Sequence, residues 1–237
     1  MRHQSQEPSP EPPFEVGLRD GLAYARWLPK GKALGGVVVL HGASSCKEKH
    51  FEFASAASRA GLAAVVFDQR GHGESDGPMD GRALEDVATI ASLLPADLPI
   101  ALRGSSMGGF MAIAAAKLTG AAAVVAICPA GPRLLLAGLR AEVLGFPVDL
   151  VAVTVLLESI DLVATVAALE VAILILHAEG DERVPIAESR ELDAVATHPL
   201  SQLIAVDGGD HHSVQHDAEL HRQSLNFITE AFGELGA

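Results

Sequence analysis

Eight short apolar segments recur along the chain and are separated by longer stretches with helical spacing. The apolar segments are residues 14–18, 22–28, 36–42, 62–68, 99–104, 122–128, 171–177 and 201–208. Arg19-Asp20-Gly21 separates the first two, which predicts an opening hairpin. Four of the others consist almost entirely of Val, Ile, Leu and Ala, without polar alternation. Strands of that composition are typical of a parallel sheet buried on both faces.

Helical stretches lie between these segments. They are residues 50–60, 82–94, 107–118, 161–169 and about 216–232. Gly61 follows the first as a C-terminal cap, and Pro95 stops the second. Alternation of strands and helices favours right-handed crossovers, with helices on both faces of the sheet. The sequence therefore predicts an α/β fold with a mostly parallel sheet of about eight strands.

One connection is longer than this rhythm requires. About forty residues separate Cys128 from Val171, whereas a crossover needs only about a dozen. Residues 161–169 supply the crossover helix, so residues 132–159 are surplus and predict a small helical cap insertion. Residues 14–131 and 160–237 then form the core, and residues 1–13, rich in Pro, form a mobile arm. The alternative is that the surplus helices simply cover the core.

Composition limits the classes of partner. The chain has 237 residues, half of them hydrophobic, and a net charge of −13. A chain this acidic is a poor non-specific binder of nucleic acid or of anionic lipid. No apolar stretch of 18 residues is free of charge, Gly or Pro, so we expect no membrane span.

Cysteine content and the N-terminal sequence favour a cytoplasmic protein. Only Cys46 and Cys128 occur, which excludes a disulfide framework but not a single bridge. Two reduced thiols are the simpler interpretation. The first 15 residues contain no apolar core of a secretory signal.

The pattern Gly-x-Ser-x-Gly occurs twice, around Ser75 and around Ser106. It has chemical meaning only on a sharp turn from a strand into a helix, where strain lifts the serine hydroxyl above the sheet edge. Ser106 follows a predicted strand and precedes an Ala-rich helix, whereas Pro78 follows Ser75. We therefore expect Ser106 to be the nucleophile. The alternative is a glycine-rich turn without chemistry.

A serine nucleophile needs a general base and an acid that orients it, which in this arrangement follow in the order Ser, acid, His. Asp181 comes directly after the strand at 171–177, with Glu182 as the alternative acid. His211 and His212 follow the last strand, and we favour His211 because it lies nearer the glycine turn. We interpret the neighbouring Asp210 as a residue that shapes the loop.

These motifs together resemble the α/β-hydrolase superfamily, in its serine-esterase branch near monoacylglycerol lipases, cinnamoyl esterases and serine aminopeptidase-like proteins. The matching pieces, spread over residues 36–227 in the family order, are His41-Gly42, Asp68-Gln69-Arg70-Gly71-His72-Gly73-Glu74-Ser75, Gly104-Ser105-Ser106-Met107-Gly108-Gly109, Gly180-Asp181-x-x-Val184-Pro185 and Gly209-Asp210-His211. Ala178 departs from the pattern, because a Gly usually follows the preceding histidine. The resemblance implies that the stretch ending at Ser75 is a structural turn.

The oxyanion formed during acyl transfer needs preorganised N–H donors. Met107 follows the nucleophile and begins a helix, so its N–H is one candidate donor. By position and by resemblance, Ala43 supplies the other, and His41 acts as loop scaffolding. We expect Ala43 and Met107 to form the substrate-binding oxyanion hole.

The remaining candidates indicate no metal or cofactor. His212 and His216 have the spacing of two ligands on one helix face, but no third ligand is evident. Cys46 is interpreted as an inert loop thiol.

The predicted function is that of a serine carboxylic-ester hydrolase with a small-molecule ester as substrate. A peptidase, an amidase or a thioesterase could use the same triad, and a non-catalytic ligand-binding protein is a further alternative. The Leu- and Val-rich insertion is expected to fold over Ser106 as a lid that lines the acyl pocket. The competing interpretation is a self-association surface, and hence a homodimer.

Overall fold

The computed structural model describes residues 10–235. Residues 1–9, most of the arm predicted over 1–13, lie outside the described residues. Within the rest of that segment, Glu11 is attached to the core: its N–H donates to Ser55 Oγ at 2.7 Å, and its carbonyl accepts from Trp27 Nε1 at 2.8 Å.

All eight predicted strands are present in one sheet. They are β1 (Glu15–Arg19), β2 (Leu22–Trp27), β3 (Gly35–Leu40), β4 (Leu62–Phe67), β5 (Ile100–Ser105), β6 (Ala123–Ile127), β7 (Ala172–Ala178) and β8 (Gln202–Val206). Their order is β1-β2-β4-β3-β5-β6-β7-β8. The pairs β1·β2 and β2·β4 are antiparallel, and all later pairs are parallel. The prediction of a mostly parallel sheet of about eight strands is therefore confirmed.

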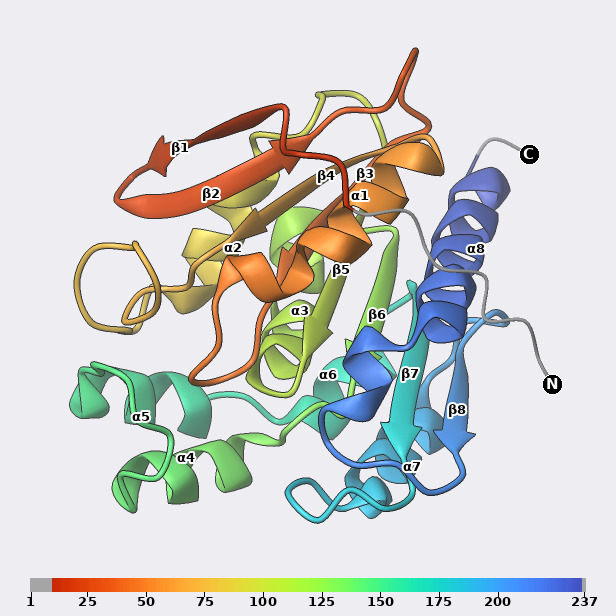
Figure 1. The fold of residues 1–237 in the computed structure, drawn as a ribbon. Coiled ribbons are helices and arrows are strands. Elements are labelled where there is room, and N and C mark those ends of the chain that lie inside the picture. The colour runs from red at the N-terminus through yellow and green to blue at the C-terminus, as the bar shows by residue number, and fades with distance from the viewer. Residues whose placement is uncertain (1–9, 236–237) are drawn as a thin grey trace, which may run out of the picture.

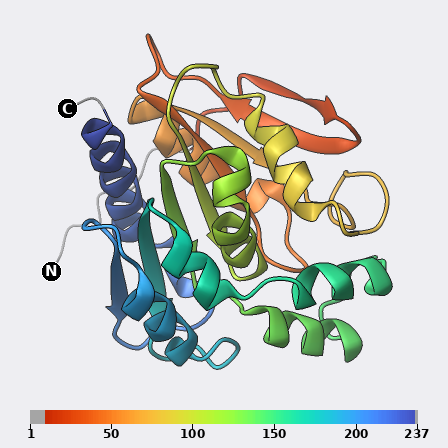
Figure 2. The same cartoon turned by 180° about the vertical axis from the view of Figure 1, so that it is seen from behind.

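Helices cover both faces of this sheet (Figures 1 and 2). The longer helices are α1 (Phe51–Arg59), α2 (Ala83–Ala91), α3 (Met107–Thr119), α4 (Pro132–Arg140), α5 (Leu150–Glu158), α6 (Leu162–Ala168), α7 (Ile186–Val195) and α8 (Ala218–Glu234), with short 3-10 turns η1 (Lys47–His50) and η2 (Ser213–His216). Helices α1 and α8 lie on one face, and α2, α3, α6 and α7 lie on the other.

Alternate side chains of each central strand feed two separate cores. In β3, Val38 and Leu40 pack towards α2 and α3, whereas Val37 and Val39 pack towards α1 and α8. Successive side chains of a strand point to opposite faces, so a strand covered on both faces must be apolar at every position. This burial explains the uninterrupted Val, Ile and Leu of the central strands.

Helices α4 and α5 lie beyond the carboxyl ends of the parallel strands (Figure 1). They belong to the segment 132–159 and are joined by an irregular stretch that contains Gly145 and Pro147. In open α/β sheets, ligands bind outside these strand ends. The two helices are therefore close to the edge where the candidate site residues gather.

Helix α7 is the one long helix that the hydrophobic pattern did not predict. Its sequence is IAESRELDAV, and only Ser189 and Leu192 are buried. Such a narrow buried stripe gives too few apolar positions to produce a clear helical period.

Among residues 10–235, no single helix is both long and apolar enough to cross a membrane. Helices α5 and α6, which meet at a 50° bend, reach that length and composition only when they are counted together. Val153, Leu157 and Val166 of this pair are buried in the core.

The contact of α3 with the sheet yields a first prediction. A Cβ at Gly108 would lie 2.4 Å from the Leu40 carbonyl oxygen, so Gly108→Ala must push helix and strand apart. Overpacking of this kind costs about 1–3 kcal/mol or more. Gly233→Ala, in α8 with open space around it, should instead stabilise by roughly 0.5–1 kcal/mol. Chemical unfolding of both variants measures the difference, and equal stability would contradict the tight packing.

Candidate active site

Ser106 occupies the turn between β5 and α3, and its backbone is strained. Its φ and ψ are 54° and −115°, a region that non-glycine residues rarely adopt. The Ser106 N–H is fixed by a 2.8 Å hydrogen bond to the carbonyl of Ile127 on β6. A Cβ at Gly104 would lie only 2.0 Å from the Gly108 carbonyl oxygen. The glycines of the motif are thus required by backbone contact, and they let the chain turn sharply beneath the serine.

Asp181 and His211 form a buried hydrogen-bonded pair. Asp181 follows β7 and His211 follows β8, and the Asp181 Oδ2 to His211 Nδ1 distance is 2.6 Å. This bond sets the orientation of the imidazole and leaves Nε2 as the nitrogen available for proton transfer. Of the two sequence candidates for the base, the structure pairs His211 with the acid and leaves His212 exposed.

The turn after β7 prepares Asp181 for this contact. Asp181 Oδ1 accepts from the N–H groups of Arg183 and Val184 at 2.8 and 2.9 Å. Burial alone would raise the pKa of Asp181, but these N–H donors and His211 together lower it below its usual value. The carboxylate is therefore ionised at neutral pH and can stabilise an imidazolium.

His177, the second-to-last residue of β7, supports this turn. Its Nε2 lies 2.9 Å from the Val184 carbonyl oxygen, and its Nδ1 lies 2.6 Å from Ser189 Oγ. Because a carbonyl can only accept, Nε2 carries the proton and Nδ1 accepts from the serine. Burial lowers the pKa of His177, which keeps the ring neutral. The sequence reasoning did not assign this role, although His177 stands four residues before the acid.

Ser106 and His211 line the same cavity of about 1050 Å³. Within residues 10–235 the Ser106 hydroxyl makes no hydrogen bond to His211, so the structure brings these two side chains to one cavity without closing the contact. Catalytic hydrogen bonds often tighten only when substrate is bound. The arrangement brings a serine hydroxyl and an imidazole bonded to a carboxylate to one opening.

Ala43 and Met107 also lie beside Ser106. Ala43 lines the cavity, and Met107 is the first residue of α3. In the described part of the chain, neither N–H donates a hydrogen bond to another protein group. The loop that contains Ala43 approaches the serine closely, because a Cβ at Gly42 would lie 3.4 Å from Ser106 Cβ. Two N–H groups are therefore available where an oxyanion would form.

Two neutral histidines hold this loop. His41 is fully buried; its Nε2 accepts from Gln69 N–H at 3.0 Å and its Nδ1 donates to the Gly42 carbonyl at 2.7 Å. His72 Nε2 accepts from Ser44 N–H at 3.1 Å. Burial lowers the pKa of His41 to about 4 and also lowers the pKa of His72. Both rings therefore act as fixed hydrogen-bonding groups, which agrees with the expected scaffolding role of His41.

Ser75 has a structural role. Its hydroxyl donates to the Asp68 carbonyl and accepts from Ala23 N–H at 2.8 Å, so it fastens the turn to β2. It does not line the cavity of Ser106.

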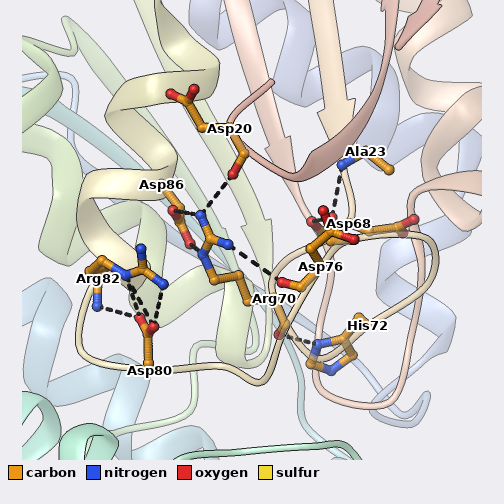
Figure 3. Close-up of polar contacts among 10 residues, drawn as sticks. Asp20, Ala23, Asp68, Arg70, His72, Asp76, Asp80, Arg82 and Asp86 are labelled. Carbon is orange, nitrogen blue, oxygen red and sulfur yellow. Dashed lines mark hydrogen bonds and ion pairs between the residues drawn. The ribbon is translucent and has the colours of Figure 1, made fainter. Parts of the chain in front are cut away.

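An ion pair stabilises the other side of this turn (Figure 3). The Arg70 guanidinium contacts both carboxylate oxygens of Asp86 at 2.9 and 3.1 Å, and it donates to the carbonyls of Asp20 and Asp76. The resemblance implied a structural turn here, and these contacts describe how it is held.

Asp210 and Glu182 lie outside the acid–base pair. Asp210 Oδ1 accepts from the N–H groups of His212 and Ser213 at 2.8 and 2.9 Å, which shapes the loop before η2. Glu182 is exposed.

The two cysteines are both free thiols. Cys128 Sγ lies within 4.8 Å of ligand atoms of Asp181 and His211, but burial raises its pKa to about 12. Metal binding needs a thiolate, so this group of three is poorly suited to hold an ion. Cys128 could not be associated with the pair from the sequence, because only the order of the strands makes β6 and β7 neighbours.

The segment 132–159 covers part of the cavity. Leu134, Leu135 and Leu144 line it. The same segment is fastened to the loop that contains Ala43, because Ser44 Oγ donates to the Leu144 carbonyl. It also contacts His72, whose ring centroid lies 4.1 Å from that of Phe146.

Comparisons with known proteins agree with this fold. The family model for serine aminopeptidase (S33) matches residues 31–141. A monoacylglycerol lipase from Paleococcus ferrophilus has a similar structure, with a TM-score of 0.71 at 18% identity over 92% of this chain and 100% of that chain. Est1E from Butyrivibrio proteoclasticus, solved with ferulic acid, gives 0.67 at 21% identity over 93% and 97%. These likenesses show that the chain has the α/β-hydrolase fold.

One curated relative is an uncharacterized abhydrolase domain-containing protein from Dictyostelium discoideum. It is 32% identical over 100 residues, which is 40% of this chain and 11% of that protein. The chain therefore matches only a small part of that relative's length. The family model matches the first part of the chain, up to residue 141, and the esterase and lipase structures match its fold.

The buried histidines predict a loss of stability in acid. Burial lowers the pKa of both His41 and His221 from 6.5 to about 4. Between these values the unfolded chain binds more protons, so the free energy of unfolding falls as the pH falls, by up to ~1.4 kcal/mol per pH unit for each histidine. Urea unfolding at about pH 7, 6 and 5 measures this slope.

His221→Asn should reduce the slope, because it removes one of the two neutral histidines whose pKa is lowered to about 4. A free energy of unfolding that is constant over this pH range would contradict the burial of neutral histidines.

Proposed function

We propose that the protein is a serine hydrolase that cleaves carboxylic esters through an acyl-enzyme. The observation that supports this most strongly is the buried Asp181–His211 pair, which opens into the same cavity as the strained Ser106. A ligand-binding protein would not require a nucleophile, a base and an orienting acid together at one cavity.

The proposed reaction has two halves. Ser106 Oγ attacks the ester carbonyl while His211 Nε2 accepts the hydroxyl proton, and Asp181 stabilises the resulting imidazolium. The N–H groups of Ala43 and Met107 hold the negative oxygen of the tetrahedral intermediate, and each such donor is worth about 3 kcal/mol. The intermediate collapses, and His211 returns the proton to the departing alkoxide. In the second half, His211 takes a proton from water, which attacks the acyl-enzyme. The second intermediate then collapses, His211 returns the proton to Ser106 Oγ, and the acid is released.

A peptidase is the second candidate, because the matching family model is described as a serine aminopeptidase. Cleavage of an amide depends more strongly on protonation of the leaving group than cleavage of an ester does. The histidine of the same triad can supply that proton. A panel of matched ester, thioester, amide and aminoacyl substrates distinguishes these activities.

Ser106→Ala should abolish both ester hydrolysis and covalent labelling by a fluorophosphonate probe, because the attacking oxygen is removed. Ser75→Ala is the matched control: it should keep the labelling but lower stability by about 1–2 kcal/mol, since a buried N–H loses its partner. Labelling is followed by intact-protein mass spectrometry, with circular dichroism as a check of folding. Persistent labelling of Ser106→Ala, or its loss in Ser75→Ala alone, would refute the assignment.

The segment 132–159 is proposed to act as a lid that lines the acyl pocket. Each buried methylene stabilises by about 0.8 kcal/mol, so kcat/KM should rise roughly fourfold per carbon until the pocket is full. The measurement is hydrolysis of p-nitrophenyl esters from acetate to dodecanoate, with light scattering in parallel. A steady fall with chain length, together with a stable dimer, would favour the self-association surface instead.

A further inference from the structure

The cavity above Ser106 has a charge opposite to that of the chain. Lys49 and Arg183 line it together with three histidines, and no Asp or Glu is among the described residues of its lining. The chain as a whole carries 30 acidic and 17 basic residues. Because acidic residues outnumber basic ones in the chain, a cavity whose Lys and Arg residues are accompanied by no Asp or Glu differs from the average composition of the chain.

Both cations are available to a ligand. In the part of the chain that the structure describes, neither Lys49 nor Arg183 forms an ion pair, and both side chains are exposed. By contrast, the neighbouring Lys47 is engaged by Asp68 at 2.8 Å, Glu48 at 2.8 Å and Glu74 at 2.6 Å, none of which lines the cavity.

The positive field extends to the histidines of the cavity wall. Burial and then the charge of Arg183 lower the pKa of His212. Burial, then Arg103 and Lys49 among other groups, lower the pKa of His216. Arg103 is fully buried behind this wall, and its guanidinium lies 3.9 Å from the Phe53 ring centroid. Three guanidinium or ammonium groups from different elements thus act on one wall.

Acids near this wall are engaged elsewhere. Asp181 is bonded to His211 and to two backbone N–H groups. Asp210 accepts from two backbone N–H groups of its own loop. These carboxylates keep their charge, but neither they nor the exposed Glu182 is among the lining residues, whereas Lys49 and Arg183 are.

The other part of the cavity is apolar. Leu134, Leu135, Val143 and Leu144 of the segment 132–159 line it. A molecule that fits both parts has an apolar portion and a negatively charged group.

We propose that the substrate is an ester that itself carries an anionic group, with the apolar portion against residues 134–144 and the anion near Lys49 and Arg183. This inference rests on the proposed ester hydrolysis. It also opposes an aminopeptidase substrate, because the free ammonium group of such a peptide would be repelled by an all-basic cavity.

Two pairs of esters test the proposal and distinguish where the anion lies. For the acyl side, mono-p-nitrophenyl suberate is compared with its ω-amide, and for the alcohol side, 4-acetoxybenzoate is compared with 4-acetoxybenzamide. The anionic member of one pair should have a kcat/KM about tenfold higher, as two partly exposed ion pairs provide. The advantage should shrink in about 1 M NaCl, where the screening length is ~3 Å.

The double variant Lys49→Gln/Arg183→Gln should lose most of this ratio. Lys30→Gln/Lys117→Gln makes the same charge change at two exposed positions outside the cavity and should retain it. The ratio of the two substrates is the readout, so an effect on folding or on general turnover does not affect it. Equal loss in both double variants would overturn the proposal, because it would reflect net charge alone.

A binding measurement separates this inference from the proposed function. Calorimetry compares 4-phenylbutyrate with 4-phenylbutanamide, neither of which can be hydrolysed as an ester, and the carboxylate should bind about tenfold more tightly. Equal binding overturns the anion site even if neutral esters are cleaved. Tighter binding of the carboxylate without any ester turnover or fluorophosphonate labelling supports the anion site and refutes the esterase.

Discussion

The close packing of helix α3 against β5 and β3 is the constraint on which the site depends. The backbone of Gly108 lies so near the Leu40 and Gly104 backbones that no side chain fits between them. The chain can make this approach only by turning sharply at Ser106, which explains the positive φ of that residue. The same turn starts α3 at Met107, and it brings the helix N-terminus, with its unpaired N–H groups, beside the hydroxyl. The packing of α3 against the sheet thus maintains the strained backbone conformation of Ser106.

The second organising feature is the separation of charge among buried polar groups. His41, His72 and His177 are kept neutral by burial and serve as hydrogen-bonding supports. Asp181 stays ionised because backbone N–H groups and His211 outweigh the cost of its burial. His177 is thus a neutral neighbour of the ionised Asp181, while His41 and His72 are neutral neighbours of Asp68, which pairs with Lys47.

The sequence could predict the sheet because burial on both faces leaves a direct mark, a run of apolar residues such as 171–177. It could not predict α7, whose only buried residues are Ser189 and Leu192. Strand and helix context distinguished Ser106 from Ser75, since their local motifs are the same. The charge of the cavity lay beyond sequence reasoning, because Lys49, Arg183 and His216 come from separate loops and meet only through the order of the strands. Cys128 illustrates the same limit, since it approaches Asp181 across two neighbouring strands.

The attachment of the segment 132–159 has a consequence for how such a protein can diversify. The stretch between α4 and α5 contacts the loop that contains Ala43 through Leu144, and it contacts the His72 ring through Phe146. The Pro147 carbonyl accepts from Met79 N–H at 3.0 Å. Exchanging the whole segment for that of another hydrolase would remove these contacts and release the loop that holds Ala43. The helices α4 and α5 can vary at their exposed positions while residues 144–147 are retained, and their buried leucines and valines must stay apolar. The part that can be exchanged is therefore the helix pair α4 and α5, and residues 144–147 are the part that must stay. Recombination that keeps residues 144–147 can change the cavity wall without releasing the loop that contains Ala43.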